Sequence, residues 1–138
     1  MALHVTLDDL TVMARTVWGE ARGEPAIGKI AVAAVILNRA RRPGWWGRTV
    51  SEVCLAKYQF TCWLPADPNR ERMLAVNLSD RALLDCVAAC LDALRGIDPT
   101  DGACHYLNPT AVGEMPRWAM NRKADVVIGR HYFYRGVD

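Results

Sequence analysis

The run Trp18–Pro25, with the sequence Trp-Gly-Glu-Ala-Arg-Gly-Glu-Pro, contains two carboxylates in opposite electrostatic settings. Glu20 continues an apolar stripe of helical spacing, so we expect it in the last turn of a helix at the edge of the core. The stripe consists of Leu10, Met13 and Val17. Burial and the negative end of the helix dipole both raise the pKa of a carboxyl group placed there. Such a group is suited to donate a proton, which makes Glu20 the candidate general acid.

Glu24 lies directly before Pro25, a favoured first residue of a helix. The positive end of the helix dipole stabilises a negative charge at this position. A structural role at the helix start and a role in binding substrate are both compatible with this setting. Glu24 is also a candidate second carboxylate beside Glu20.

The periodicity of the apolar residues predicts helices first and strands later. We expect helices over Leu7–Ala21, from Pro25 to about Arg41, and from the Ser79–Asp80 cap to Gly96, with a helical turn near Thr49–Cys54. The segment Pro43–Asn77 otherwise has the composition of a long loop, which in a small domain is usually functional. Strands are expected over Ala103–Leu107 and Arg130–Arg135, paired antiparallel. This order of elements indicates an α+β fold.

The chain has 138 residues, of which 51% are hydrophobic, enough for a single packed domain over residues 1–138. Its 17 basic and 15 acidic residues give a net charge of +2, too small an excess to indicate a nucleic-acid partner. No apolar run approaches the ~20 residues that cross a bilayer, so stable membrane insertion is not expected. The first residues lack the features of a secretory signal, and we expect a monomer made in the cytoplasm.

The cysteines do not form a recognisable disulfide or metal pattern. There are five, at positions 54, 62, 86, 90 and 104, and no two have the C-x-x-C spacing. Cys86 and Cys90 share a helical face and could join Cys54, Cys62 or His105 around zinc, but the spacing matches no zinc module. We therefore expect buried free thiols, no metal and no cofactor.

Further motifs follow the first in a fixed order. They are Gly28 with Ala31–Arg39, Thr49–Val53, Gln59–Phe60, Asp98–Gly102, Tyr106–Pro109 and Ile128–Arg135. Together with Ala14–Pro25, these segments closely resemble the cell-wall hydrolase family typified by the spore cortex-lytic enzymes of the SleB type. The chain departs from that pattern at Met115–Asn121, which enlarges a loop, and it lacks the signal and the peptidoglycan-binding repeats of the spore enzymes.

The resemblance implies a compact domain related to lysozyme-like lytic transglycosylases. It also implies that the first glutamate of the motif, here Glu20, is catalytic. The expected substrate is the glycan strand of peptidoglycan, cut at the β-1,4 bond between N-acetylmuramic acid and N-acetylglucosamine. Without a signal peptide, such an enzyme would act on the wall after release, as expected of a phage or prophage lysis protein or a particle-borne enzyme.

Six further residues are candidates for the sugar cleft. Gln59, Tyr106 and Asn108 would supply polar groups, and Phe60 or Tyr132 a flat apolar face for a pyranose ring. The sixth candidate is the second glutamate of the motif. Each also has a structural interpretation, in which the amides bond within loops and the aromatic rings pack in the core.

Three functions remain open from the residues. A lytic transglycosylase needs one carboxylate, because the C6 hydroxyl of the muramic acid attacks the anomeric carbon and gives a 1,6-anhydro ring, so Glu20 serves first as acid and then as base. A hydrolytic muramidase would use Glu20 with Glu24 or another acid that activates water. A catalytically silent wall-binding or virion structural domain would keep the cleft without requiring Glu20. An amidase is disfavoured because no zinc site is evident.

Overall fold

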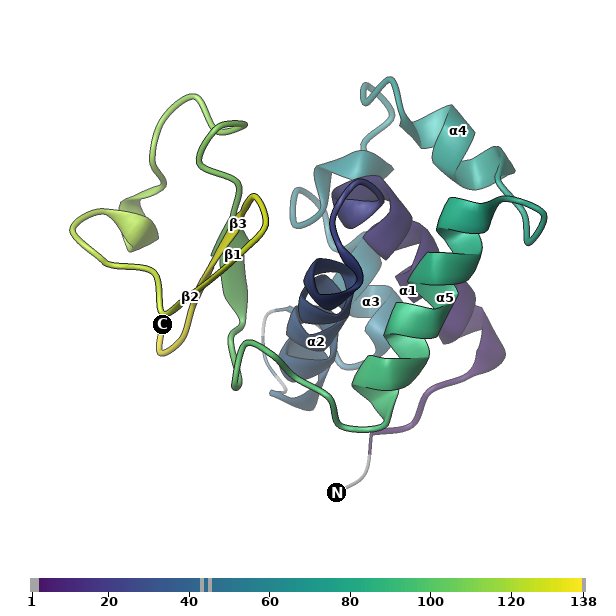
Figure 1. Cartoon of the computed structure of the whole chain (residues 1–138), viewed down its shortest axis with the longest axis horizontal. Coiled ribbons are helices and arrows are strands. Elements are labelled where there is room, and N and C mark those ends of the chain that lie inside the picture. The colour runs from purple at the N-terminus through teal and green to yellow at the C-terminus, as the bar shows by residue number, and fades with distance from the viewer. Residues whose placement is uncertain (1–2, 43, 45, 138) are drawn as a thin grey trace.

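Helices come first and a small antiparallel sheet comes last in the computed structural model, which describes residues 3–42, 44 and 46–137 (Figure 1). The helices are α1 Leu7–Ala21, α2 Ala26–Arg41, α3 Val50–Leu55, α4 Arg70–Ala75 and α5 Arg81–Leu94. The strands are β1 His105–Leu107, β2 Val126–Ile128 and β3 His131–Tyr134. Two 3₁₀ turns, η1 Thr61–Trp63 and η2 Arg117–Ala119, lie in the connecting loops. The predicted α+β order is confirmed, and Pro43, the first residue of the predicted loop, lies outside the described residues.

Helix α1 begins at a capping box. The Thr6 hydroxyl accepts the Asp9 N–H at 3.0 Å, and the Asp9 carboxylate accepts the Thr6 N–H at 3.0 Å, which satisfies two amides that the first helical turn leaves free. The second oxygen of Asp9 accepts the N–H and the hydroxyl of Ser51 in α3. The start of α1 is therefore fixed both locally and against α3, and its predicted bounds are confirmed.

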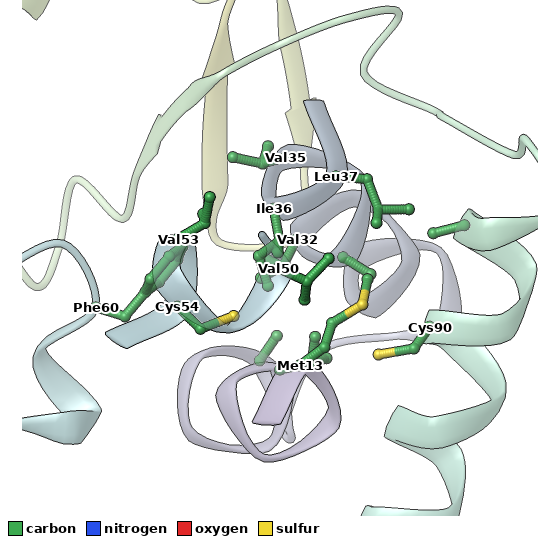
Figure 2. Packing of buried hydrophobic residues seen from close by; sticks show 14 of the residues in the cluster. Met13, Val32, Val35, Ile36, Leu37, Val50, Val53, Cys54, Phe60 and Cys90 are labelled. Carbon is green, nitrogen blue, oxygen red and sulfur yellow. The ribbon is translucent and has the colours of Figure 1, made fainter. Parts of the chain in front are cut away.

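Helix α2 is the centre of the hydrophobic core. Every residue from Ala31 to Leu37 is 3% exposed or less, so this helix is buried on all sides. Its apolar side chains meet Met13 of α1, Val50 of α3 and Cys90 of α5 (Figure 2). The sheet and α5 lie on opposite sides of α2 (Figure 1). The sequence placed Pro25 inside this helix, whereas its extended ψ of 164° makes it the residue before the first turn.

The sheet has the strand order β1-β3-β2, with both pairings antiparallel. Tyr106 of β1 lies opposite Phe133 of β3, which confirms the predicted pairing of these segments. Strand β2 and helix α4 were not predicted. Because β2 has three residues and α4 has six, neither is long enough to show a clear apolar period.

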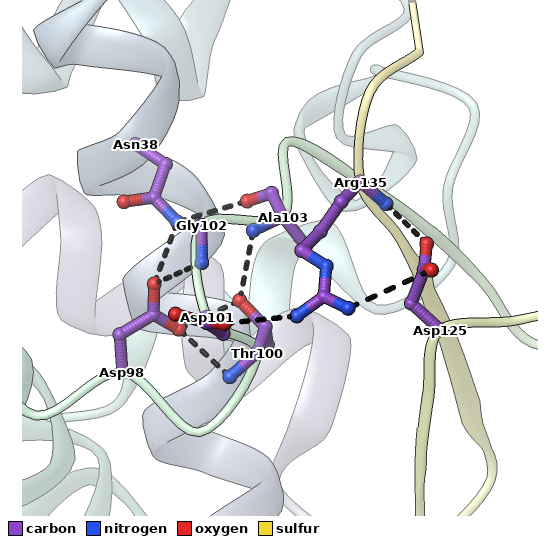
Figure 3. A network of polar contacts seen from close by, with 8 residues as sticks. All are labelled: Asn38, Asp98, Thr100, Asp101, Gly102, Ala103, Asp125 and Arg135. Atoms are coloured by element: carbon purple, nitrogen blue, oxygen red, sulfur yellow. Dashed lines mark hydrogen bonds and ion pairs between the residues drawn. The ribbon is translucent and has the colours of Figure 1, made fainter.

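A polar network fixes the chain where it leaves the helices and enters β1 (Figure 3). The Asn38 side-chain amide of α2 donates to Asp98 Oδ2 and to the carbonyl of Ala103, both at 2.9 Å. The other oxygen of Asp98 accepts the N–H and the hydroxyl of Thr100. The half-buried side chain of Asn38 thus ties the turn before β1 to α2.

Gly19 allows α1 to approach η1 closely. A Cβ at this position would lie 2.7 Å from Cβ and 2.8 Å from Sγ of Cys62. We therefore predict that Gly19→Ala destabilises the fold by about 1–3 kcal/mol, measured by urea denaturation.

Gly23→Ala is the matched control, because nothing lies within 4 Å of a Cβ there. Adding Cys62→Gly to Gly19→Ala should recover part of the lost stability, since it removes the side chain that the new methyl group meets. Equal midpoints for the parent and Gly19→Ala would contradict the close approach.

Candidate active site

Glu20 lines a cavity of about 450 Å³ between the helices and the sheet. The structure brings four residues proposed from the sequence to this cavity, namely Glu20, Gln59, Tyr106 and Asn108. The remaining lining comes from Arg39, Thr61, Leu107, Ala111, Val112 and His131. Residues from α1, α2, the loop around η1, β1 and β3 therefore converge on one hollow.

The carboxyl group of Glu20 is held by the sheet. The Tyr106 hydroxyl donates to Glu20 Oε1 at 2.6 Å, a short bond of the kind made to carboxylates. Glu20 lies in the last turn of α1, which contains no basic residue of its own, and Arg22 at the C-cap donates to the carbonyl of Trp18 at 3.3 Å. The hydrogen bond from Tyr106 to Glu20 connects residues that are far apart in the sequence and fixes one oxygen of the carboxyl group.

Burial raises the pKa of Glu20 above its ordinary value of 4.5. Hydrogen bonds from Tyr106 and from the Cys62 thiol oppose this effect, as does the positive charge of Arg39, while the negative charge of Asp67 adds to it. Burial outweighs the opposing contributions. The direction agrees with the sequence-based expectation, and removal from water is its main cause.

Glu24 makes structural contacts at the edge of a second, smaller cavity of about 80 Å³, which Glu20 and Asn108 also line. Glu24 Oε1 accepts the N–H of Arg130 at 2.7 Å and lies 3.6 Å from His131 Nδ1. The carboxylate is buried against the β2–β3 turn, where a Cβ at Gly129 would collide with it. Glu24 thus ties the start of α2 to the sheet, and its role in binding substrate remains a prediction.

His131 lines both cavities and sits against Tyr106, with ring centroids 5.0 Å apart. Burial lowers the pKa of His131 despite the opposing charge of Glu24. The ring is therefore held in its neutral form near neutral pH. From the sequence alone, the place of His131 on the last predicted strand indicates only a packing role, because that position is not informative until the sheet is paired.

Two aromatic residues proposed for the cleft lie elsewhere. Phe60 is 2% exposed and belongs to the helical core, so its ring has no free face for a sugar. Tyr132 pairs with Leu107 and packs against a second cluster that includes Ala119 and Val137. Neither ring is part of the lining of the two cavities described above. The sequence shows that both rings are apolar, but only tertiary packing decides which rings keep an open face.

Arg39 is a charged cavity residue that the sequence did not single out. Its place in the basic run Arg39–Arg42 predicts, from the sequence alone, a solvated helix end. In the structure it is 6% exposed, and its Nε donates to the carbonyl of Cys104 at 2.8 Å. The available signal was its helical spacing from Val32 and Val35, which places it on the buried side of α2.

Thiols, metal ligands and membrane-spanning helices are the other features of the described residues that could carry a function. All five cysteines are buried free thiols. Within residues 3–42, 44 and 46–137, no three His, Cys, Asp or Glu side chains gather closely enough to hold a metal ion. No helix of these segments has the length and apolar character needed to span a bilayer.

The sequence matches the family described as Cell Wall Hydrolase over residues 23–134, a span that begins after Glu20. Curated relatives extend across the whole motif. The chain is 36% identical over 132 residues to a spore cortex-lytic enzyme of Halalkalibacterium halodurans, which covers 91% of this chain and 34% of the relative. It is 35% identical to the spore cortex-lytic enzyme of Bacillus subtilis, and the match covers 91% of this chain and 37% of that relative. The chain spans less than half the length of these relatives.

Two solved structures are similar over nearly the full length. One is the catalytic domain of the Bacillus cereus SleB protein, with a TM-score of 0.76, 33% identity, and coverage of 96% of this chain and 94% of that one. The other is the catalytic domain of the germination-specific lytic transglycosylase SleB from Bacillus anthracis, with a TM-score of 0.75, 33% identity, and coverage of 96% and 98%. The lytic-transglycosylase-like fold expected from the sequence is confirmed.

The raised pKa of Glu20 predicts a stability cost at neutral pH. A carboxyl group that binds its proton more tightly in the folded state stabilises the fold below the unfolded pKa, and that contribution is lost as the pH rises through the folded pKa. Glu20→Gln should therefore melt at a higher temperature than the parent at pH 7. The difference should shrink as the pH falls through the raised pKa of the folded state, and it should level off below the ordinary value of 4.5.

Glu114→Gln is the control, because Glu114 is exposed. The melting temperatures of the parent and both variants, measured at several pH values, would test this prediction. A Glu20→Gln variant less stable than the parent at pH 7 would contradict the assigned cost of burying this carboxyl group.

Proposed function

Because the chain belongs to the cell wall hydrolase family, we propose that it cleaves the β-1,4 bond between N-acetylmuramic acid and N-acetylglucosamine in peptidoglycan. The observation that carries this proposal is the position of Glu20, a carboxyl group with a raised pKa that lines an open cavity and is held by Tyr106. A proton donor of this kind is what departure of a glycosidic oxygen requires.

The proposed reaction is that of a lytic transglycosylase. Glu20 gives its proton to the bridging glycosidic oxygen, and the bond from that oxygen to the anomeric carbon of the muramic acid breaks. The C6 hydroxyl oxygen of the same sugar bonds to the anomeric carbon, and its proton passes to Glu20. The product is a 1,6-anhydromuramic end, no water is consumed, and Glu20 returns to its protonated form.

The distribution of carboxylates favours this reaction. Glu20 is the one carboxylate among the described residues that line the larger cavity. Hydrolysis by inversion would place a second carboxylate about 6.5–9.5 Å away to activate a water molecule. The nearest acid in the motif, Glu24, is already engaged by the backbone N–H of Arg130.

Tyr106 would keep Glu20 ready for both halves of the reaction. Burial raises the pKa of the Tyr106 hydroxyl well above its ordinary value, so it remains a hydrogen-bond donor over the working pH range. Its bond to Oε1 leaves Oε2 for the transferred proton. Gln59 and Asn108 would bind polar groups of the glycan from the other walls of the cavity.

A hydrolytic muramidase is the second candidate, because Glu24 borders the small cavity that Glu20 also lines. In that reaction a carboxylate activates water, and the muramic acid keeps a free reducing end. Products and variants separate the two mechanisms.

Glu20→Gln should reduce cleavage of purified peptidoglycan by about 10²–10⁴-fold or more, because the amide keeps the size of the side chain and has no acidic proton to give. Turbidity clearance and release of soluble muropeptides would measure the effect. Glu24→Gln should be milder. Full activity in Glu20→Gln would refute the assignment, and complete loss in a folded Glu24→Gln protein would favour the muramidase.

The product distinguishes the chemistry directly. Digestion should leave 1,6-anhydromuramic ends that are lighter by one water, roughly 18 Da, than hydrolytic ends and that resist borohydride reduction. Mass spectrometry before and after borohydride treatment would show both properties. Reducible muramic ends alone would exclude the transglycosylase mechanism, and reducible N-acetylglucosamine ends would show that the other glycosidic bond is cut.

A further inference from the structure

Arg39 carries a buried charge with one unsatisfied group. Its Nη1 is buried without a hydrogen-bond partner among the described residues. No described carboxylate lies within ion-pair distance of it. Its guanidinium carbon lies 5.2 Å from the ring centroid of Phe60 and 5.5 Å from that of Trp46. Because arginine keeps its proton at any working pH and buried charges are normally paired, this residue requires a partner.

The cavity beside Arg39 contains a partner, Glu20, whose carboxyl group changes charge when it gives up its proton. Arg39 and Glu20 line the same cavity, and the charge of each affects the pKa of the other. The bond from Nε to the carbonyl of Cys104 anchors the guanidinium just before β1, which carries Tyr106. The guanidinium therefore lines the same cavity as Glu20 and Tyr106, close enough for its charge to affect the pKa of Glu20.

The other titratable groups around Glu20 come from every element packed near it. They are Cys54 of α3, Cys62 of η1, Asp67 of the following loop, Tyr106 of β1, His131 of β3 and Glu24 after α1. Burial raises the pKa of both thiols, so they are uncharged near neutral pH. Arg39 is the one permanent cation among the described residues that line the larger cavity.

We propose that Arg39 is a positioning residue whose buried guanidinium stabilises the Glu20 carboxylate after that group has given up its proton. The inference rests on the proposed acid–base role of Glu20. While Glu20 is protonated, Nη1 has no anionic partner. When the proton leaves for the glycosidic oxygen, the carboxylate and the guanidinium neutralise each other inside the cavity. The cation thus favours proton transfer without contacting the bond that breaks.

The first test replaces the charge. Arg39→Met should lower kcat about 10- to 100-fold on a soluble glycan oligomer, with KM nearly unchanged, because the ionised form of Glu20 loses its stabilising cation. Without the cation Glu20 holds its proton to higher pH, so the alkaline limb of the kcat profile should also move to higher pH. Arg39→Lys, which keeps the charge, should recover much of kcat.

Arg42→Met is the matched control. Arg42 is exposed, its guanidinium carbon lies 5.7 Å from the ring centroid of Trp46, and its Nη1 lies 3.6 Å from Cys104 Sγ, yet it does not line the cavity. This variant should retain the parental kcat and pH profile. A folded Arg39→Met protein with an unmoved alkaline limb would overturn the proposal, as would a rise in KM at constant kcat, which would indicate direct substrate binding.

A second test needs no Arg39 variant and no substrate. In the parent, the ¹⁵N NMR signal of Arg39 Nε should shift with the same pH midpoint as the ¹³C carboxyl signal of Glu20, and in Glu20→Gln it should stay constant over that range. A parental Arg39 signal that does not follow Glu20 would overturn the coupling. Since no glycan is present, that failure would leave the proposed cleavage reaction untouched.

Discussion

The structure depends on keeping one carboxyl group out of water at the end of α1. The last turn of a helix is electrostatically unfavourable for a glutamate, and burial adds to the cost of its charge. A fold that retains such a group needs rigid neighbours on every side. Tyr106, Cys62 and Arg39 provide them from β1, η1 and α2, so the position of Glu20 is determined by three separate segments.

Each of these segments has its own anchor. Gly19 lets η1 come close enough for Cys62 to reach the carboxyl group. Asn38 ties the turn before β1 to α2 and so sets where Tyr106 emerges. Arg39 bonds to the carbonyl of Cys104 one residue before β1. Asn38 and Arg39 both lie on α2, so the central position of this helix in the core fixes both anchors.

Local signals in the sequence predicted much of this arrangement. The capping box and the apolar stripe define α1 without help from tertiary structure, and Glu20 follows from its place on that stripe. The sequence places Tyr106 on a predicted strand. Its hydrogen bond to Glu20 depends on the turn Asp98–Gly102, which directs the chain from α5 back to α2. The sequence identifies residues suited to a cleft, and the pairing among them comes from tertiary packing.

The positions of Phe60, Tyr132 and Arg39 could not be predicted from the sequence, for a shared physical reason. Phe60 is near the cleft residue Gln59 in sequence, yet its ring packs inward, because which of two neighbouring side chains faces the core is decided by the surrounding helices. The sequence offers Tyr132 as a sugar-binding ring because it does not determine the sheet register, and the pairing with Leu107 places this ring beside the second cluster. The sequence predicts Arg39 at a solvated helix end, because charged residues are rarely buried, whereas the structure buries it beside the cavity.

The most direct test of the central role of Glu20 is a crystal structure of the Glu20→Gln variant with a peptidoglycan tetrasaccharide. We expect the bridging glycosidic oxygen within hydrogen-bond distance of the Gln side chain at position 20, with the C6 hydroxyl of the muramic acid facing its own anomeric carbon. A glycan bound with its muramic linkage away from position 20, or with an ordered water held by another carboxylate opposite the anomeric carbon, would contradict the account.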